Sequence, residues 1–269
     1  MGAKELFESG DLSGAVAQVT EEVKANPRDL RSRIFLFELL CFTAEFVRAE
    51  RQLDAIAQTS GDVKVELGIQ VYRDVIAAEK IRREFFRAGR AQPKFITEPP
   101  AYAALHLEAV AKNAQDRSGD TEELLKKAAE LRAPIAGRSD GTAFADCIDG
   151  DALVGPFLEV IAQKDYLWIP LEQIQSIEIQ PPKTLRDLLW VSARVALRGR
   201  PLGDIFVPVN YHRSAEHAND LIKLGRMTEW LPLGEAFVLG MGQRSFLLDD
   251  DEKPLLELRK IDFAELVEP

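Results

Sequence analysis

Internal similarity at a spacing of 34 residues is the feature that most constrains this chain. The positions that align across this spacing are Leu6, Gly10, Leu12, Ala15, Val19 and Val23 with Leu40, Ala44, Phe46, Ala49, Leu53 and Ala57. This period is typical of the tetratricopeptide repeat, whose two antiparallel helices need a small residue where they approach closely. Ala15 and Ala49 occupy that position, and Pro27 is a helix stop after the first unit. The sequence therefore predicts two TPR-like units, with two unrelated amphipathic helices as the alternative.

Further helices are predicted as far as residue 132. Residues 31–42 are apolar on nearly every side, which indicates a buried central helix. In residues 63–86 the apolar positions recur at helical spacing, at Val63, Leu67, Val71, Val75 and Ile76. After an interruption by prolines the pattern resumes in residues 101–114 and 121–131, giving six or seven helices in all. The later helices are expected to cap the repeat stack, because two repeats alone would expose their end faces.

A different pattern follows residue 132. Residues 133–141 are rich in turn formers, so we predict a boundary there between a TPR-like helical domain, 1–132, and a β-rich domain, 142–269. The second part consists of short apolar runs separated by turns: PFLEVI, DYLWIP, QSIEIQ, WVSARVAL, DIFVPV, TEWLPL, AFVLGMG and RSFLL. One helix is expected at residues 214–224, with Ser214 as its N-cap. The predicted fold class is α+β, with an antiparallel sheet or small barrel after the helical half.

Composition limits the classes of partner. The chain has 44 acidic against 34 basic side chains and a net charge of -10, which disfavours nucleic acid and anionic membranes and favours a partner with a cationic amphipathic face. No apolar run is long enough to cross a bilayer, and no signal peptide is recognisable, so a cytoplasmic location is expected. Cys41 and Cys147 stand far apart, which predicts buried reduced thiols.

No catalytic, metal or cofactor site is predicted. His212 and His217 are interpreted as surface residues, and His106 as a hydrogen-bonded residue within a helix. The acidic segment 146–151 lacks the ligand spacing of a calcium loop and is interpreted as a solvated turn. Residues 240–242 lack the third glycine of a dinucleotide fingerprint and are interpreted as close packing in a strand or turn.

The helical half is the candidate for function, because stacked helix pairs form a concave surface that can bind a peptide or a helix. Extending the repeat register to the second unit places Ile34, Glu38, Cys41 and Phe42 on or near the face that lines this groove. The alternative is that Ile34, Cys41 and Phe42 belong to the core.

Four segments in one order carry a resemblance to a known family. They are ELFESGDLSGAVAQVTEEVKANPRDLRSRIFLFELLCF, ERQLD, DYLWIPLEQIQSIEIQPPKTLRDLLW and RMTEWLPLGEAFVLGMGQRSFLL. Together they resemble the ImpE/TagJ (SciE-type) family, accessory proteins of bacterial type VI secretion. The resemblance implies an adaptor that binds the N-terminal helix of the small sheath subunit and assists a ClpV-type AAA+ ATPase indirectly. The alternative function is a ligand-binding or enzymatic β domain regulated by the helical half.

Overall fold

A computed structural model describes residues 1–265 of the chain. Seven helices come first: α1 (Ala3–Ser9), α2 (Leu12–Ala25), α3 (Leu30–Phe42), α4 (Phe46–Ser60), α5 (Val63–Ala88), α6 (Tyr102–Asn113) and α7 (Ser118–Leu131). The sheets that follow are entirely antiparallel, so the predicted α+β class and the order of its halves are confirmed. Within residues 1–265, no helix combines the length and apolar character needed to cross a membrane.

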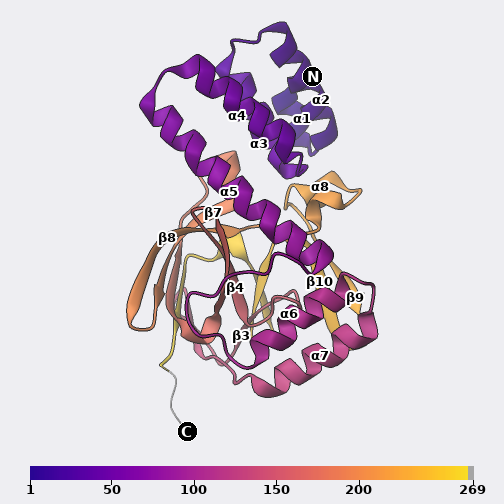
Figure 1. Ribbon diagram of the computed structural model, residues 1–269, viewed down its shortest axis with the longest axis vertical. Coiled ribbons are helices and arrows are strands. Elements are labelled where there is room, and N and C mark those ends of the chain that lie inside the picture. The colour runs from indigo at the N-terminus through magenta and orange to yellow at the C-terminus, as the bar shows by residue number, and fades with distance from the viewer. Residues whose placement is uncertain (266–269) are drawn as a thin grey trace.

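The first four helices form consecutive antiparallel pairs, shown in indigo and violet in Figure 1. Ala15 and Ala49, the predicted close-approach positions, are fully buried. Side chains fix the helix starts, since the carboxylates of Asp11, Asp29 and Asp62 accept hydrogen bonds from the first turns of α2, α3 and α5. Gly61 ends α4 with a φ of 58°, a left-handed conformation that favours glycine.

The β half contains three sheets. The largest has eight strands in the order β2-β1-β13-β6-β7-β8-β4-β5, and smaller sheets are formed by β12-β11-β3 and β10-β9. The strands are β1 (Gly137–Ser139), β2 (Thr142–Phe144), β3 (Cys147–Asp149), β4 (Phe157–Ala162), β5 (Asp165–Pro170), β6 (Ile174–Ile179), β7 (Trp190–Leu197), β8 (Arg200–Pro208), β9 (Thr228–Leu233), β10 (Phe237–Gly242), β11 (Ser245–Leu248), β12 (Asp251–Pro254) and β13 (Lys260–Phe263). Each predicted apolar run forms a strand.

The large sheet is buried on both faces along its last two strands, β4 and β5. Phe157 and Ile161 join the core shared with the helices, whereas Leu158 and Val160 join a second core inside the β half. This alternation follows from the two-residue period of a strand. Helix α5 lies across the first face, and Figure 1 shows it running diagonally over the β half with its N-terminal end projecting beyond the sheet.

Two predictions about helices are wrong. Helices α6 and α7 do not cap the repeat stack but lie against the β half (Figure 1), where His106 of α6 contacts the Leu153 carbonyl and Glu122 of α7 accepts from the Glu235 amide. The expected helix at 214–224 is divided into a 3-10 turn, Ser214–Glu216, and a short α8, Asp220–Lys223. Asn219 caps α8, while Ser214 is buried and bonds to the Tyr211 carbonyl.

Candidate functional site

All four predicted groove residues lie on α3, and they lie in different environments. Glu38, Cys41 and Phe42 are buried, and Cys41 and Phe42 belong to the core shared by both halves. Ile34, one turn earlier, is 37% exposed. Ile34 is therefore the member of this set that presents apolar surface to a partner in the folded chain.

A segment from the β half covers the α3 face around Glu38. This segment, Thr184–Leu189, connects β6 to β7 and contains the 3-10 helix η2, Leu185–Leu188. Its Arg186 lies 3.2 Å from the Glu38 carboxylate and stacks on the Tyr72 ring at 4.5 Å. Burial raises the pKa of Glu38, and the nearby Arg186 opposes that rise. The chain thus fills this part of the predicted groove with its own side chains.

The largest group of exposed apolar side chains in the helical half lies on α5. Val63, Leu67 and Val71 follow one another at intervals of four residues, so they form a single row on the helix, which we call the α5 stripe. Their exposed fractions are 67%, 65% and 43%, respectively. Sequence periodicity indicated that this face would be apolar, and the structure shows that the described chain leaves it uncovered.

The position of the α5 stripe follows from how the helix stack ends. Helix α5 packs on α4, but the next helix, α6, approaches α5 only at its far end, where Gly89 lies against Ala111. A 26-residue helix is about 39 Å long, so this contact leaves the first turns of α5 distant from α6. The stack therefore ends in an amphipathic helix that lacks a covering helix along its N-terminal part.

The opposite end of α5 carries a buried ionic network, which sequence reasoning missed. Arg82 donates to Glu159 of β4 at 2.7 and 3.2 Å and to Glu79 at 3.0 Å. Arg244, the residue before β11, bonds to the same Glu159 and to Asp149. Both arginines are buried, so the network ties α5 to two sheets of the β half.

The carboxylates of this region have strongly shifted pKa values. Burial opposes ionisation of Glu159, but Arg82 and Arg244 outweigh it and hold the pKa of Glu159 well below its usual range. Burial raises the pKa of Asp149 to about 6, against the opposing charge of Arg244. Burial and the neighbouring Asp149 raise the pKa of Asp151 to about 7. The interpretation of residues 146–151 as a solvated turn is therefore wrong.

Aromatic groups enclose the network on the sheet side. Tyr166 donates to Glu159 at 2.5 Å, and the Trp168 indole donates to the Tyr166 oxygen at 2.6 Å. Both side chains are buried. The network and its aromatic neighbours therefore join the two halves through buried, charge-assisted hydrogen bonds.

The two histidines and the glycine segment considered in the sequence pack within the fold. His106 is buried and bonds to the Leu153 carbonyl at 3.1 Å, as predicted. His212 is buried as well, so its interpretation as a surface residue is wrong. Gly240 lies against the Tyr211 ring, which confirms close packing in that strand. Within the described residues, no group of three or more His, Cys, Asp or Glu side chains is placed to hold a metal ion.

Comparisons with known proteins agree with this architecture. The model of the ImpE protein family matches residues 141–262. A curated relative from Pseudomonas aeruginosa, named type VI secretion system accessory component TagJ, is 34% identical over 263 residues, which is 98% of this chain and 91% of the relative. The crystal structure of protein VPA1032 from Vibrio parahaemolyticus shares the fold with a TM-score of 0.90 and 23% identity, covering 98% of each chain.

Proposed function

This chain belongs to the ImpE family, and from that membership we propose that it is a non-enzymatic adaptor of bacterial type VI secretion. The partner in this proposal is the N-terminal helix of the small sheath subunit. The relative from Pseudomonas aeruginosa supports the secretion role through its name, accessory component of the type VI secretion system.

The observation that carries the proposal is the uncovered α5 stripe. Val63, Leu67 and Val71 offer one turn-spaced row, which is the surface that an apolar helix face needs for packing. Burying a side chain of this size contributes about 1.5–3 kcal/mol, so a few such contacts offset the cost of association. An amphipathic partner helix would then take the place of the covering helix that the stack lacks.

Charge complements this surface. The exposed charged residues around the first stripe residue are Asp62, Glu66 and Lys64, two acidic and one basic, and the whole chain carries a net charge of -10. Basic residues beside the apolar face of a partner helix would therefore steer and orient it. The proposed assistance to a ClpV-type ATPase requires only that the adaptor hold this helix, with no catalytic group of its own.

Peptide titration tests the proposal. A fluorescently labelled peptide that covers the N-terminal helix of the small sheath subunit is titrated with the full chain, and anisotropy gives the affinity. Leu67→Glu should weaken binding by about tenfold or more, because a charge replaces a buried apolar contact. The matched control is Val47→Glu on α4, where an apolar side chain 61% exposed is changed in the same way.

Two results would move or remove the site. If Ile34→Glu weakens binding and Leu67→Glu does not, then the partner binds at the predicted α3 position instead of the α5 stripe. If neither the peptide nor the intact sheath subunit binds the wild-type chain, the adaptor proposal is wrong.

A further inference from the structure

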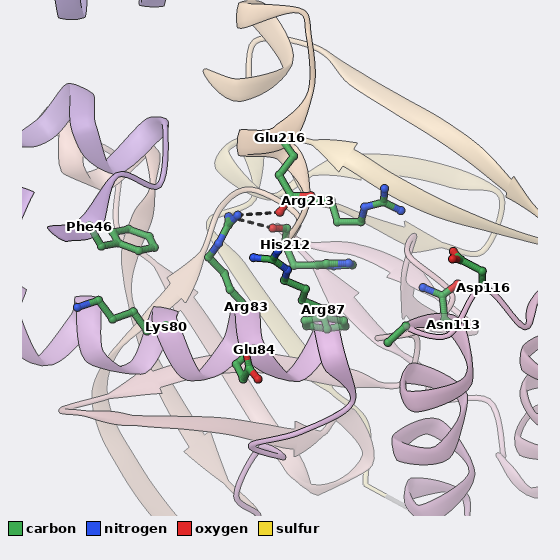
Figure 2. Close-up of a pocket in the computed structure, with 12 residues that line it drawn as sticks. Phe46, Lys80, Arg83, Glu84, Arg87, Asn113, Asp116, His212, Arg213 and Glu216 are labelled. Atoms are coloured by element: carbon green, nitrogen blue, oxygen red, sulfur yellow. Dashed lines mark hydrogen bonds and ion pairs between the residues drawn. The ribbon is translucent and has the colours of Figure 1, made fainter. Parts of the chain in front are cut away.

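A cavity of about 320 Å³ lies where α5, the end of α6 and the segment after β8 meet. Figure 2 shows its labelled side chains, with Arg83 and Arg87 of α5 on one side of His212 and Asn113 and Asp116 at the end of α6 on the other. The cavity is separate from the α5 stripe, because it adjoins the C-terminal turns of α5.

Four basic and three acidic side chains line this cavity. The lining includes the cations Lys80, Arg83, Arg87 and Arg213 and the carboxylates Glu84, Asp116 and Glu216. An excess of cations is unusual in a chain with a net charge of -10. The lining thus carries a small excess of positive charge, opposite in sign to the net charge of the whole chain.

The ion pairs of the lining residues show which basic side chains are available to bind a ligand. Glu216 holds Arg83 at 3.0 Å, and Glu84 pairs with Arg90 at 3.0 Å outside the lining. Lys80 pairs with Glu50 at 2.7 Å. Within residues 1–265, neither Arg87 nor Arg213 lies within ion-pair distance of a carboxylate, and Asp116 is the lining carboxylate without a cation at that distance. The guanidinium groups of Arg87 and Arg213 thus line one cavity, and their N–H groups are available to a ligand.

His212 supplies an independent observation. Its side chain is only 6% exposed and stacks on Phe86 with ring centroids 3.9 Å apart and planes within 10°. Its Nε2 has no hydrogen-bond partner among the described residues. Leaving such a buried polar atom unpaired is unfavourable, and a ligand oxygen that bonds to it would remove this cost.

The protonation state of His212 suits a donor role. Burial lowers the pKa of His212 well below its usual value, and the positive charges of Arg82, Arg213 and Arg83 add to this effect. The ring is therefore neutral at neutral pH and can donate one hydrogen bond from Nε2 in the appropriate tautomer. Arg83 is held in place by the His212 carbonyl at 3.2 Å, so one wall of the cavity is pre-organised.

From these observations we infer that the cavity binds a phosphate group carried by a small molecule. Arginine forks match the oxygens of phosphate, and a phosphate carries up to two negative charges with three or more acceptor oxygens, enough for Arg87, Arg213 and His212 together. The volume of about 320 Å³ lies at the lower end of small-molecule sites, so it holds the phosphate together with a small organic part.

Calorimetric titration of the full chain with inorganic phosphate and with AMP tests this inference, at constant ionic strength set with sodium chloride. Saturable binding is expected, and Arg87→Gln and Arg213→Gln should each weaken it by about tenfold. The control is Arg73→Gln, which changes an arginine of the same helix that pairs with Asp54 outside the cavity and should leave affinity unchanged. Circular dichroism melting verifies that each variant is folded.

A second readout follows His212 directly. In a long-range ¹H–¹⁵N spectrum of the imidazole rings, phosphate or AMP should shift the His212 Nε2 signal, and His212→Phe, which retains an aromatic ring on Phe86, should weaken binding. AMP binding tighter than phosphate would indicate that the organic part fills the cavity, whereas equal affinities would indicate phosphate alone. No saturation by either ligand up to about 10 mM, a level that corresponds to less than about 3 kcal/mol, would overturn the inference. Binding that Arg87→Gln and Arg213→Gln leave unchanged would overturn it as well.

Discussion

The two ends of α5 have opposite environments. At the N-terminal end Val63, Leu67 and Val71 are exposed, whereas at the C-terminal end Glu79 and Arg82 are buried. One continuous helix thus exposes a row of apolar side chains near its start and buries two charged side chains near its end. Helical periodicity therefore identifies the apolar and polar faces of a helix. Which of those faces is buried depends on the other elements that pack against the helix.

The largest expected effect comes from breaking the buried end. Arg82→Met keeps the size of the side chain but leaves Glu79 and part of Glu159 without their partner in a buried site. The free energy of unfolding should fall by about 3–5 kcal/mol, as measured by urea denaturation. Arg90→Met, which removes an exposed ion pair, should cost less than about 1 kcal/mol. Equal losses in the two variants would contradict the assignment of the network as the link between the halves.

The pH dependence of the β-side carboxyls is the next effect in size. The pKa of Asp151 is about 7 in the folded chain, above its ordinary value, so the folded state keeps a proton that the unfolded state has already released. Its contribution to stability is therefore present at acid pH and is lost as pH rises toward 7. Relative to Asp151→Asn, the wild type should lose on the order of 3 kcal/mol between pH 4 and pH 7. Urea denaturation curves across this pH range measure the difference in free energy of unfolding between the two proteins. A difference that stays constant with pH would contradict a raised pKa for Asp151.

A smaller effect is expected where the β half covers α3. Arg186→Gln removes the stack on Tyr72 and the charge beside Glu38, and should cost about 1–2 kcal/mol in urea denaturation. Arg186→Lys keeps the charge without the planar guanidinium, so its loss should lie between the wild type and Arg186→Gln. No change in either variant would show that Leu185 and Leu188 alone hold this segment in place.

The smallest effect on stability should come from the exposed end. Leu67→Ser alters an exposed position and should change the free energy of unfolding by no more than about 0.5 kcal/mol. Ile76→Ala, on the same helix but fully buried, should cost about 2–5 kcal/mol. If Leu67→Ser were as costly as Ile76→Ala, a contact would cover the α5 stripe in solution.

Local pattern predicted the secondary structure well. The apolar runs after residue 132 all form strands, and in the run WVSARVAL the alternate residues Val191, Ala193 and Val195 are buried while Arg194 is exposed. These features depend on neighbours within a few residues, which the sequence displays directly. The repeat spacing also singled out Ala15 and Ala49, and both are fully buried.

Pairs that are distant in the chain were not predictable in the same way. Asp149 and Arg244 are 95 residues apart, so nothing near residue 149 shows that its charge is compensated. One signal was available: Glu159 lies in the middle of a strand whose other described positions are apolar, and such a charge is usually buried with a partner. The partner itself required the tertiary structure, as did the covering of Glu38 by Arg186.

The ionic network also determines the order in which the chain can fold during synthesis. Arg82 emerges from the ribosome 77 residues before Glu159, and Arg244 follows much later. Until Glu159 and Arg244 have both been made, the charged turns of α5 must stay hydrated, since burying them alone would leave unpaired charges away from water. We therefore expect the last third of α5 to dock only after β11 has been made, so that the helical half reaches its final state after the residues of β11 have been synthesised.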